Sequence, residues 1–164
     1  MKEQLDQFVQ RRAQELLDRG LVAVEAGNYV TALNEFRASV FVERTAEALT
    51  YWGWMEHQLG DTERAVELCH EAIGEDPQYG NPYNDIGSYL VVLGRSDEAI
   101  GWFEKAIASE CYEPRQFPHL NLAKLYLAGK QYKLALHHFE EALRYDPDDL
   151  DTQEAVLAIK KILQ

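Results

Sequence analysis

The chain has 164 residues and a formal net charge of −12 at pH 7, and no apolar run approaches the roughly 20 residues of a membrane span. A polyanion is repelled by the phosphates of nucleic acids, so the composition excludes nucleic acid as a partner and favours a protein partner that is basic or apolar. The two cysteines form no CxxC pair, and the charged N-terminal residues lack the apolar core of a signal peptide. These features predict a cytoplasmic protein.

The first residues of the chain already show helical spacing. Leu5, Phe8 and Val9 lie three or four positions apart, and the same spacing continues into Ala13. Residues 1–12 are therefore expected to extend the first helix by about three turns. Their apolar side chains lack an obvious partner, so they either pair two copies of the chain in a homodimer or cap the structure that follows.

Four markers recur at intervals of 33 to 36 residues. Each interval contains a small residue, a glycine, an alanine and, four positions after the alanine, a larger core-type residue. In chain order these are Gly20, Gly27, Ala32 and Phe36; Gly53, Gly60, Ala65 and Cys69; Gly87, Gly94, Ala99 and Phe103; and Ala123, Gly129, Ala135 and Phe139. The small residue admits a close neighbouring helix, and the glycine ends a helix in the left-handed conformation. The pattern predicts an all-α chain of four helix–turn–helix units.

These markers resemble those of the tetratricopeptide repeat family, whose unit is a helix–turn–helix of about 34 residues. The resemblance covers residues 13–147, and the four repeats it defines lie at 13–45, 46–79, 80–113 and 116–149. It implies a right-handed solenoid with a helical extension before it and a capping helix over residues 148–164. The sequence departs from the family pattern at Cys111, which stands where the third repeat should have its closing proline, and in two extra residues within CYEPRQFP.

Nine helices are expected in this arrangement. The pairs lie near 13–26 and 28–42, 46–59 and 61–74, 81–93 and 96–109, and 116–128 and 131–145, with a last helix near 149–163. Asn28 and Asp61 are suitable N-caps. Five apolar residues of the last helix are expected to share one side and cover the open face of the fourth repeat. They are Leu150, Val156, Leu157, Ile159 and Ile162.

The stretch LTYWGWMEHQLG places three aromatic residues around Gly53. Trp52 and Trp54 point to roughly opposite faces, because successive helical residues are about 100° apart. Trp52 is expected to be buried against the second helix of its own repeat. Trp54, with Tyr51 beside it, is expected on the inner face of the solenoid, where an exposed tryptophan is a typical anchor for a bound protein.

The resemblance implies that the inner face of each first helix lines a peptide-binding groove. The groove residues assigned in this way are Leu17, Leu21, Thr50, Tyr51, Trp54, His57, Asn81, Asn84, Ser88, Val91, Leu120, Asn121, Lys124 and Leu127. Some members of the family hold a carboxylate-ended peptide with a basic clamp. The matching positions here lack those basic residues, and Asp85 among them would repel a carboxylate.

No combination of residues predicts catalysis. His137 and His138 point about 100° apart, so at most one of them can join Glu141 as a metal ligand, and a closed metal site needs more ligands. His119 is expected to pack at a helix junction. The sequence contains no phosphate loop and no nucleophile elbow, so no cofactor or metal is expected and the chain is predicted not to be an enzyme.

The sequence therefore predicts a non-catalytic scaffold that holds a partner peptide or helix in its concave groove. One alternative is a secretion- or pilus-type chaperone that masks an apolar client segment. An acidic repeat array with a flanking helix resembles the class II chaperones of type III secretion, and the chain also resembles bacterial pilus-assembly repeat proteins. The other alternative is a homo-oligomeric assembly module that pairs through Leu5, Phe8 and Val9.

Overall fold

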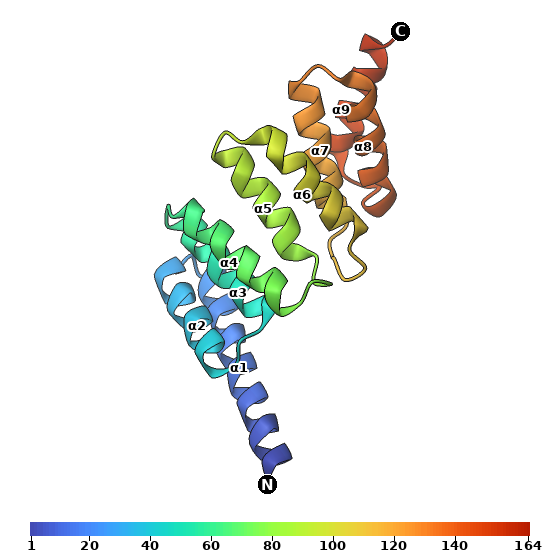
Figure 1. Ribbon diagram of the computed structural model, residues 1–164. Helices are drawn as coiled ribbons and strands as arrows, with labels where there is room; N and C mark the ends of the chain where they lie inside the picture. Colours follow the sequence, from blue (N-terminus) through green and yellow to red (C-terminus); the bar gives the residue numbers. More distant parts are fainter.

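The computed structural model describes residues 1–164 and consists of nine α-helices joined by short loops (Figure 1). They are α1 (Lys2–Glu25), α2 (Tyr29–Val42), α3 (Ala46–Gln58), α4 (Thr62–Glu75), α5 (Asn81–Val92), α6 (Ser96–Ala108), α7 (Gln116–Ala128), α8 (Tyr132–Tyr145) and α9 (Leu150–Ile162). The predicted all-α class is confirmed. None of the nine helices combines the length and the hydropathy that a bilayer crossing requires.

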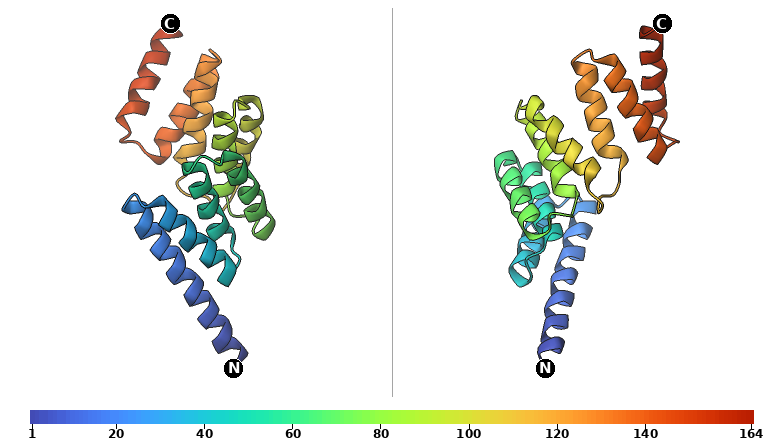
Figure 2. Two further views of the ribbon diagram at one scale, coloured as in Figure 1. Left: turned by 90° about the vertical axis from the view of Figure 1, so that its left-hand side faces the viewer. Right: turned by 45° about the vertical axis from the view of Figure 1, so that its right-hand side comes forward.

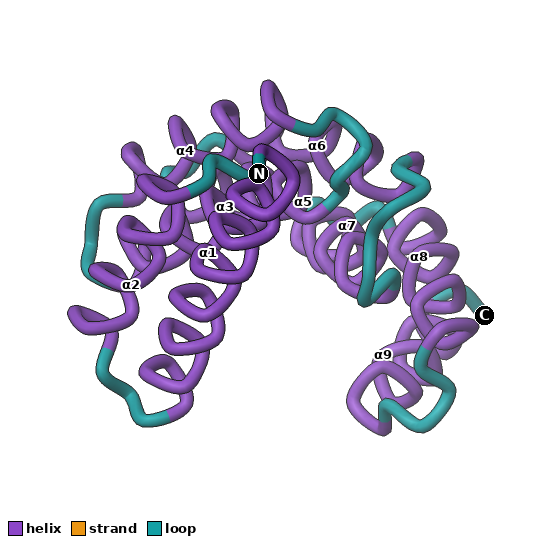
Figure 3. The backbone as a smooth tube through the Cα atoms, turned by 90° about the horizontal axis from the view of Figure 1, so that it is seen from below, coloured by secondary structure: helices purple, strands orange, loops and turns teal.

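Helices α1 to α8 form four antiparallel pairs, and each pair packs against the next one along the chain. Figure 3 shows the stack as an arch in which α1, α3, α5 and α7 form the inner side and α2, α4, α6 and α8 the outer side. Helix α9 follows the fourth pair and packs against α8. The arrangement confirms the predicted right-handed solenoid of four repeats, and it makes the inner side a concave surface built from the first helix of each repeat.

The two helices of a repeat touch where the first carries a small residue and the second a large one. A Cβ atom added at Gly20 would lie 2.3 Å from the Phe36 ring, and one added at Gly87 would lie 2.6 Å from the Phe103 ring. Both rings are fully buried. These contacts set how closely the paired helices approach each other, because a side chain at either glycine would force them apart.

The predicted N-caps are confirmed. The side-chain oxygen of Asn28 accepts a hydrogen bond from the Thr31 amide at 3.4 Å, and that of Asp61 accepts one from the Arg64 amide at 3.0 Å. Each cap satisfies an amide that the first turn of the helix leaves without a partner. Helices α2 and α4 therefore begin where the sequence predicts.

Three of the four turn glycines have the predicted left-handed backbone. Their φ values are +70° at Gly27, +102° at Gly60 and +75° at Gly94. The prediction is wrong for Gly129, whose φ is −77°, and Lys130 takes the left-handed conformation there with φ 57°. Gly129 follows its small residue, Ala123, by six positions rather than seven, so the position that ends α7 falls on a lysine.

The loop with two extra residues packs against the preceding linker. The Gly80 amide donates to the Cys111 carbonyl oxygen at 2.9 Å, and Tyr79 and Cys111 form an isolated parallel bridge. Ser109 Oγ donates to the Gln78 carbonyl oxygen at 2.7 Å. The linker between α4 and α5 is thereby tied to the loop between α6 and α7, which positions Tyr79.

Both ends of the array leave apolar side chains exposed. The N-terminal turns of α1 project beyond the array (Figure 2), with Leu5 and Phe8 both more than half exposed. In α9, Val156 and Ile159 are buried against the fourth repeat as predicted. The prediction is wrong for the other three apolar residues, because α9 packs against one neighbouring helix and this covers only part of its circumference. The exposed residues are Leu150, Leu157 and Ile162.

Replacing Gly87 by alanine should destabilise the protein, although alanine is the better helix former. The added methyl group would overlap the Phe103 ring, and such overpacking costs about 1–3 kcal/mol, against roughly 1 kcal/mol gained in helix propensity. Gly101→Ala in α6 is the matched control, because a Cβ atom there meets no atom within 4 Å. Chemical denaturation should show a loss for the first variant and a gain for the second, and a gain for both would contradict the close contact.

Replacing Lys130 by glycine should stabilise the protein. A left-handed conformation costs an L-residue about 1–2 kcal/mol that glycine avoids, so the free energy of unfolding is expected to rise by about 1 kcal/mol. The reverse change, Gly94→Lys, should lower it, since Gly94 has the same conformation and open space around it. Thermal unfolding of the two variants measures both effects, and no rise for Lys130→Gly would contradict this description of the turn.

Candidate binding groove

The inner helices α3 and α5 enclose a small cavity near the middle of the array. Its volume is about 140 Å³. Four of its six lining residues belong to the groove assigned from the sequence, and they are Thr50, Tyr51, Trp54 and Asn81. Tyr79 and Asp85 complete the lining. The Tyr51 ring stacks on buried Phe36, with centroids 5.2 Å apart, and lies 6.3 Å from the Trp54 ring. The cavity thus combines three aromatic rings with one carboxylate.

A second hollow lies between α5, α6 and α7 and has a volume of about 410 Å³. Four more of the assigned residues line it, and they are Ser88, Val91, Asn121 and Lys124. Buried Phe103 forms part of its floor, whereas Val91 and Lys124 are exposed. Eight of the fourteen assigned residues are therefore divided between two neighbouring hollows of the inner surface.

Two asparagines that were assigned to the groove bond to each other. Asn121 Nδ2 donates to Asn84 Oδ1 at 3.0 Å and to Ser88 Oγ at 3.4 Å. Asn84 is almost completely buried. This network ties α7 to α5, so Asn84 has a structural role in addition to any contact that it makes with a partner.

Burial limits two of the assigned groove residues. Thr50 lines the cavity but is only 5% exposed, and its hydroxyl donates to the Ala46 carbonyl oxygen of its own helix. Leu17 is only 3% exposed and packs in the core with Ala32 and Phe36, so its side chain offers no surface to a partner. The remaining assigned leucines, Leu21, Leu120 and Leu127, are partly buried and pack against core clusters near the two ends of the array. His57 Nδ1 lies 3.0 Å from Thr62 Oγ1, and its ring packs 4.6 Å from Tyr89.

Trp52 packs against α4, the second helix of its own repeat, as predicted, but it is partly exposed and not buried. Its Nε1 donates to Glu56 at 2.7 Å, and the guanidinium carbons of Arg37 and Arg64 lie 5.5 and 5.4 Å from its ring centroid. These two arginines belong to α2 and α4. Trp52 therefore joins three helices on the side away from the cavity, as cation–π contacts allow for a half-buried ring.

The surface around the cavity is acidic. Burial raises the pKa of Asp85 to about 7, and burial together with Asp18 raises the pKa of Glu47. Burial, followed by the charges of Glu47 and Asp85, also raises the pKa of Tyr51. None of the ion pairs in the structure includes Asp18, Glu47 or Asp85. These three carboxylates beside the cavity therefore have no ion-pair partner within the chain.

The histidines of the fourth repeat form a packed cluster at a helix junction. His119 is buried, as predicted, and its Nδ1 lies 3.1 Å from His138 Nδ1. Burial, followed by the charges of His119 and His137, lowers the pKa of His138 to about 4. No group of three or more histidine, cysteine, aspartate or glutamate side chains has the geometry of a metal site.

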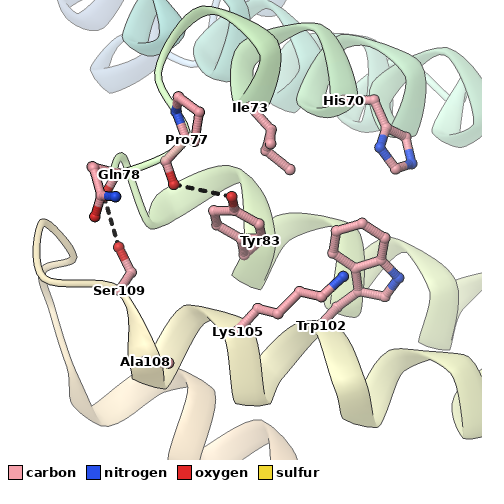
Figure 4. A pocket seen from close by; sticks show the side chains of 9 residues that line it. All are labelled: His70, Ile73, Pro77, Gln78, Tyr83, Trp102, Lys105, Ala108 and Ser109. Carbon is pink, nitrogen blue, oxygen red and sulfur yellow. Dashed lines mark hydrogen bonds between the residues drawn. The ribbon is translucent and has the colours of Figure 1, made fainter.

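The outer surface has a pocket that the sequence reasoning missed (Figure 4). It lies between α4, α5 and α6 and has a volume of about 390 Å³. Trp102 forms one wall, with Lys105 Nζ 4.0 Å from its ring centroid and His70 edge-on to it at 5.2 Å. The Tyr83 hydroxyl donates to the Pro77 carbonyl oxygen at 3.0 Å. The one available signal was that Trp102 precedes the core residue Phe103, which places it beside the buried face of α6.

Two family models described as tetratricopeptide repeat match the chain, one over residues 17–80 and one over 117–149, and together they cover more than half of it. The chain belongs to the tetratricopeptide repeat family. The Photosystem I assembly protein Ycf3 of Synechococcus sp. (strain CC9311) is 32% identical over 98 residues, which are 53% of this chain and 57% of that protein. Human Tetratricopeptide repeat protein 6 is 27% identical over 89 residues, which are 54% of this chain and 17% of that protein. The chain thus spans less than two thirds of either relative.

Solved structures share the architecture. PilF of Pseudomonas aeruginosa superposes with a TM-score of 0.84 at 20% identity, covering 92% of this chain and 68% of that one. The type IV pilus biogenesis factor PilW gives 0.80 at 18% identity, covering 92% and 69%. The first TPR of Spaghetti (RPAP3) bound to the HSP90 peptide SRMEEVD gives 0.67 at 18% identity, covering 74% and 98%. At these identities the similarity establishes the fold.

Replacing Asp85 by asparagine should change how stability depends on pH. The folded pKa of about 7 lies above the ordinary value of 3.8, so the folded state binds the proton more tightly and the contribution of Asp85 to stability is lost as pH rises from about 4 to 7. At pH 8 the free energy of unfolding of the variant should exceed that of the wild type by about 2 kcal/mol. That is half of what about 1.4 kcal/mol per pKa unit gives, because solvent reaches the carboxylate. Denaturation at pH 5 and 8 measures this, and a difference that is the same at both pH values would refute it.

Proposed function

We propose that this protein is a non-catalytic scaffold that binds a peptide or helix of another protein along the inner surface of its solenoid. The observation that carries the proposal is the cavity between α3 and α5, where Tyr51 and Trp54 are partly exposed on packed helices with open space beside them. Aromatic side chains held in this way are typical centres of protein-binding surfaces, since they bury a large area at little cost in side-chain entropy.

The partner proposed for this surface is basic or apolar. Asp85 and Glu47 leave the inner surface negative, so a segment of opposite charge gains from electrostatic complementarity and an acidic one is repelled. The RPAP3 structure holds the peptide SRMEEVD, which carries three acidic side chains, on the same fold. A ligand of that charge does not suit the groove of this chain, and its partner is expected to differ in chemistry.

A cytoplasmic location belongs to the same proposal. Cys69 is buried, Cys111 is exposed, and the two form no disulfide. Free thiols of this kind are usual in a reducing compartment.

The second candidate is a chaperone or assembly role that uses the ends of the array. Leu5 and Phe8 are 61% and 55% exposed on α1, with Val9 beside them. PilF and PilW share the fold, and PilW is described as a pilus biogenesis factor. Pairing of two copies through these residues would make the mass in solution depend on concentration, whereas a monomeric scaffold would keep one mass.

Trp54→Ala should abolish capture of the partner from a native lysate, because it removes the ring that anchors the bound segment. Trp102→Ala is the matched control, since it removes the same side chain from the outer pocket. Both variants must first show thermal unfolding close to that of the wild type. Loss of captured proteins with Trp54→Ala alone supports the groove. Their retention, or their loss with Trp102→Ala alone, would overturn it and direct attention to the outer pocket.

A further inference from the structure

The cavity between α3 and α5 has the composition of a site for a positively charged group. Tyr51, Trp54 and Tyr79 contribute aromatic rings, and Asp85 contributes a carboxylate. The faces of aromatic rings attract cations, and a carboxylate adds a charge-assisted hydrogen bond in the same place. A cavity of about 140 Å³ is large enough for the head group of a single side chain and too small for a folded element.

Asp85 has no cation to neutralise it within the chain. It forms no ion pair, and the charged groups that act on its surroundings, Glu47 and Asp18, are also acidic. Burial raises the pKa of Asp85, and a hydrogen bond with the neutral Asn84 side chain lowers it less strongly.

The Asp85 carboxylate and three aromatic rings line the same cavity. Burial, followed by the charges of Glu47, Tyr51 and Asp85, raises the pKa of Tyr79. Burial, followed by the charge of Asp85, raises the pKa of Tyr89. The buried Tyr89 hydroxyl has no hydrogen-bond partner. The cavity therefore contains an uncompensated acid in an aromatic setting.

No basic side chain lines the cavity that contains Asp85. Arg44 lines the adjoining pocket with Glu47 and Tyr79, but it is paired with Glu71 and Glu75. Around Asp85, helix α3 contributes Glu47, Tyr51 and Trp54, and α4 contributes Cys69. The linker before α5 contributes Tyr79 and the loop before α7 contributes Tyr112. Burying a charged carboxylate among such neighbours is unfavourable until an opposite charge arrives. A neutral apolar group in the cavity would leave that penalty in place, and an anion would increase it.

We propose that this cavity receives the arginine or lysine side chain of the segment bound in the groove, with the cation held between the rings of Tyr51, Trp54 and Tyr79 and paired with Asp85. The inference rests on the proposed scaffold function and makes it specific, because it selects partner segments that carry a basic residue facing α3 and α5. Negative potential from Glu47 and Asp18 raises the local concentration of such segments.

The direct test uses single amino-acid derivatives in place of the unidentified partner. N-acetyl-arginine amide and N-acetyl-lysine amide are titrated into the whole protein while the indole N–H signals of Trp52, Trp54 and Trp102 are followed by NMR, with Trp54→Phe used for assignment. N-acetyl-citrulline amide is the probe control, because it has the shape of arginine without the charge. The two cationic amides should shift the Trp54 signal in a saturable way, and citrulline should bind at least tenfold more weakly.

Two carboxylate-to-amide variants complete the design. Asp85→Asn should weaken binding of the cationic amides at least tenfold at pH 8, and thermal unfolding confirms that it is folded. Glu104→Gln, an exposed site on α6, should leave the affinity unchanged. Lowering the pH from 8 to 5 should weaken binding to the wild type, because Asp85 becomes protonated. Equal binding of arginine and citrulline, equal shifts of all three tryptophans, or unchanged affinity in Asp85→Asn would each overturn the cation site.

The two proposals fail separately. If Trp54→Ala abolishes capture from lysate but the cationic amides do not bind, the groove function stands and the cation site is wrong. If the amides bind through Asp85 but capture does not depend on Trp54, the cavity is a cation site that the captured partners do not use, and the groove function is wrong.

Discussion

The contact between a small residue on the first helix and a large one on the second is the constraint on which the rest of this structure depends. At Gly20 and Gly87 the phenylalanine ring of the partner helix occupies the space that a Cβ atom would need. This fixes the separation and the angle of the two helices, and repetition of the unit turns one angle into a curved array. The concave surface and its cavity follow from that curvature, because they lie where the first helices of successive repeats meet.

Much of the fold could be predicted because its signals are local and repeat. The N-caps Asn28 and Asp61 and the packing glycines each act within a few residues or across one helix pair, so the sequence spacing contains the information. The failures occur where one repeat differs from the others. The repeat pattern predicted a left-handed conformation at Gly129, but Lys130 adopts it, because the turn of the fourth repeat is shifted by one position. The exposed apolar residues of α9 were assigned as buried because a helical face does not reveal how many neighbours cover it.

Less of the site could be predicted than of the fold, because the exposure of a residue on the inner surface depends on contacts with other repeats. The phase of α3 placed Tyr51 and Trp54 on the inner surface correctly, since a helical period determines direction. Whether a residue is exposed there depends on the next repeat, and for this reason Leu17 proved to be a core residue. Asp85 appeared in the sequence only as an obstacle to an acidic ligand. Its burial, and the approach of Tyr79 from the linker, depend on the contact between two loops that are about 30 residues apart.

The acidic side chains of the chain differ in whether a basic side chain pairs with them, and the difference follows the two sides of the array. Arg44 pairs with Glu71 and Glu75, and Arg64 pairs with Glu67, so arginines neutralise carboxylates along α4 on the outer side. The inner carboxylates receive no such partner. Salt screens charges only beyond about 8 Å at physiological ionic strength. A bound segment that lies closer than this therefore experiences the different charge of the inner and the outer surface.

A partly buried acid with no opposite charge beside it lowers the stability of the free protein, and such costs are typical of positions that serve a ligand. For Asp85, the loss of stability and the proposed binding of a cation both depend on whether the carboxyl group is protonated. Near pH 7 the carboxyl group is protonated in part of the molecules, because burial holds its pKa at about 7. A cation that pairs with the ionised form lowers that pKa, so entry of the cation releases the proton and recovers the free energy that burial cost. Affinity for a basic segment, stability and pH are then coupled through a single carboxyl group.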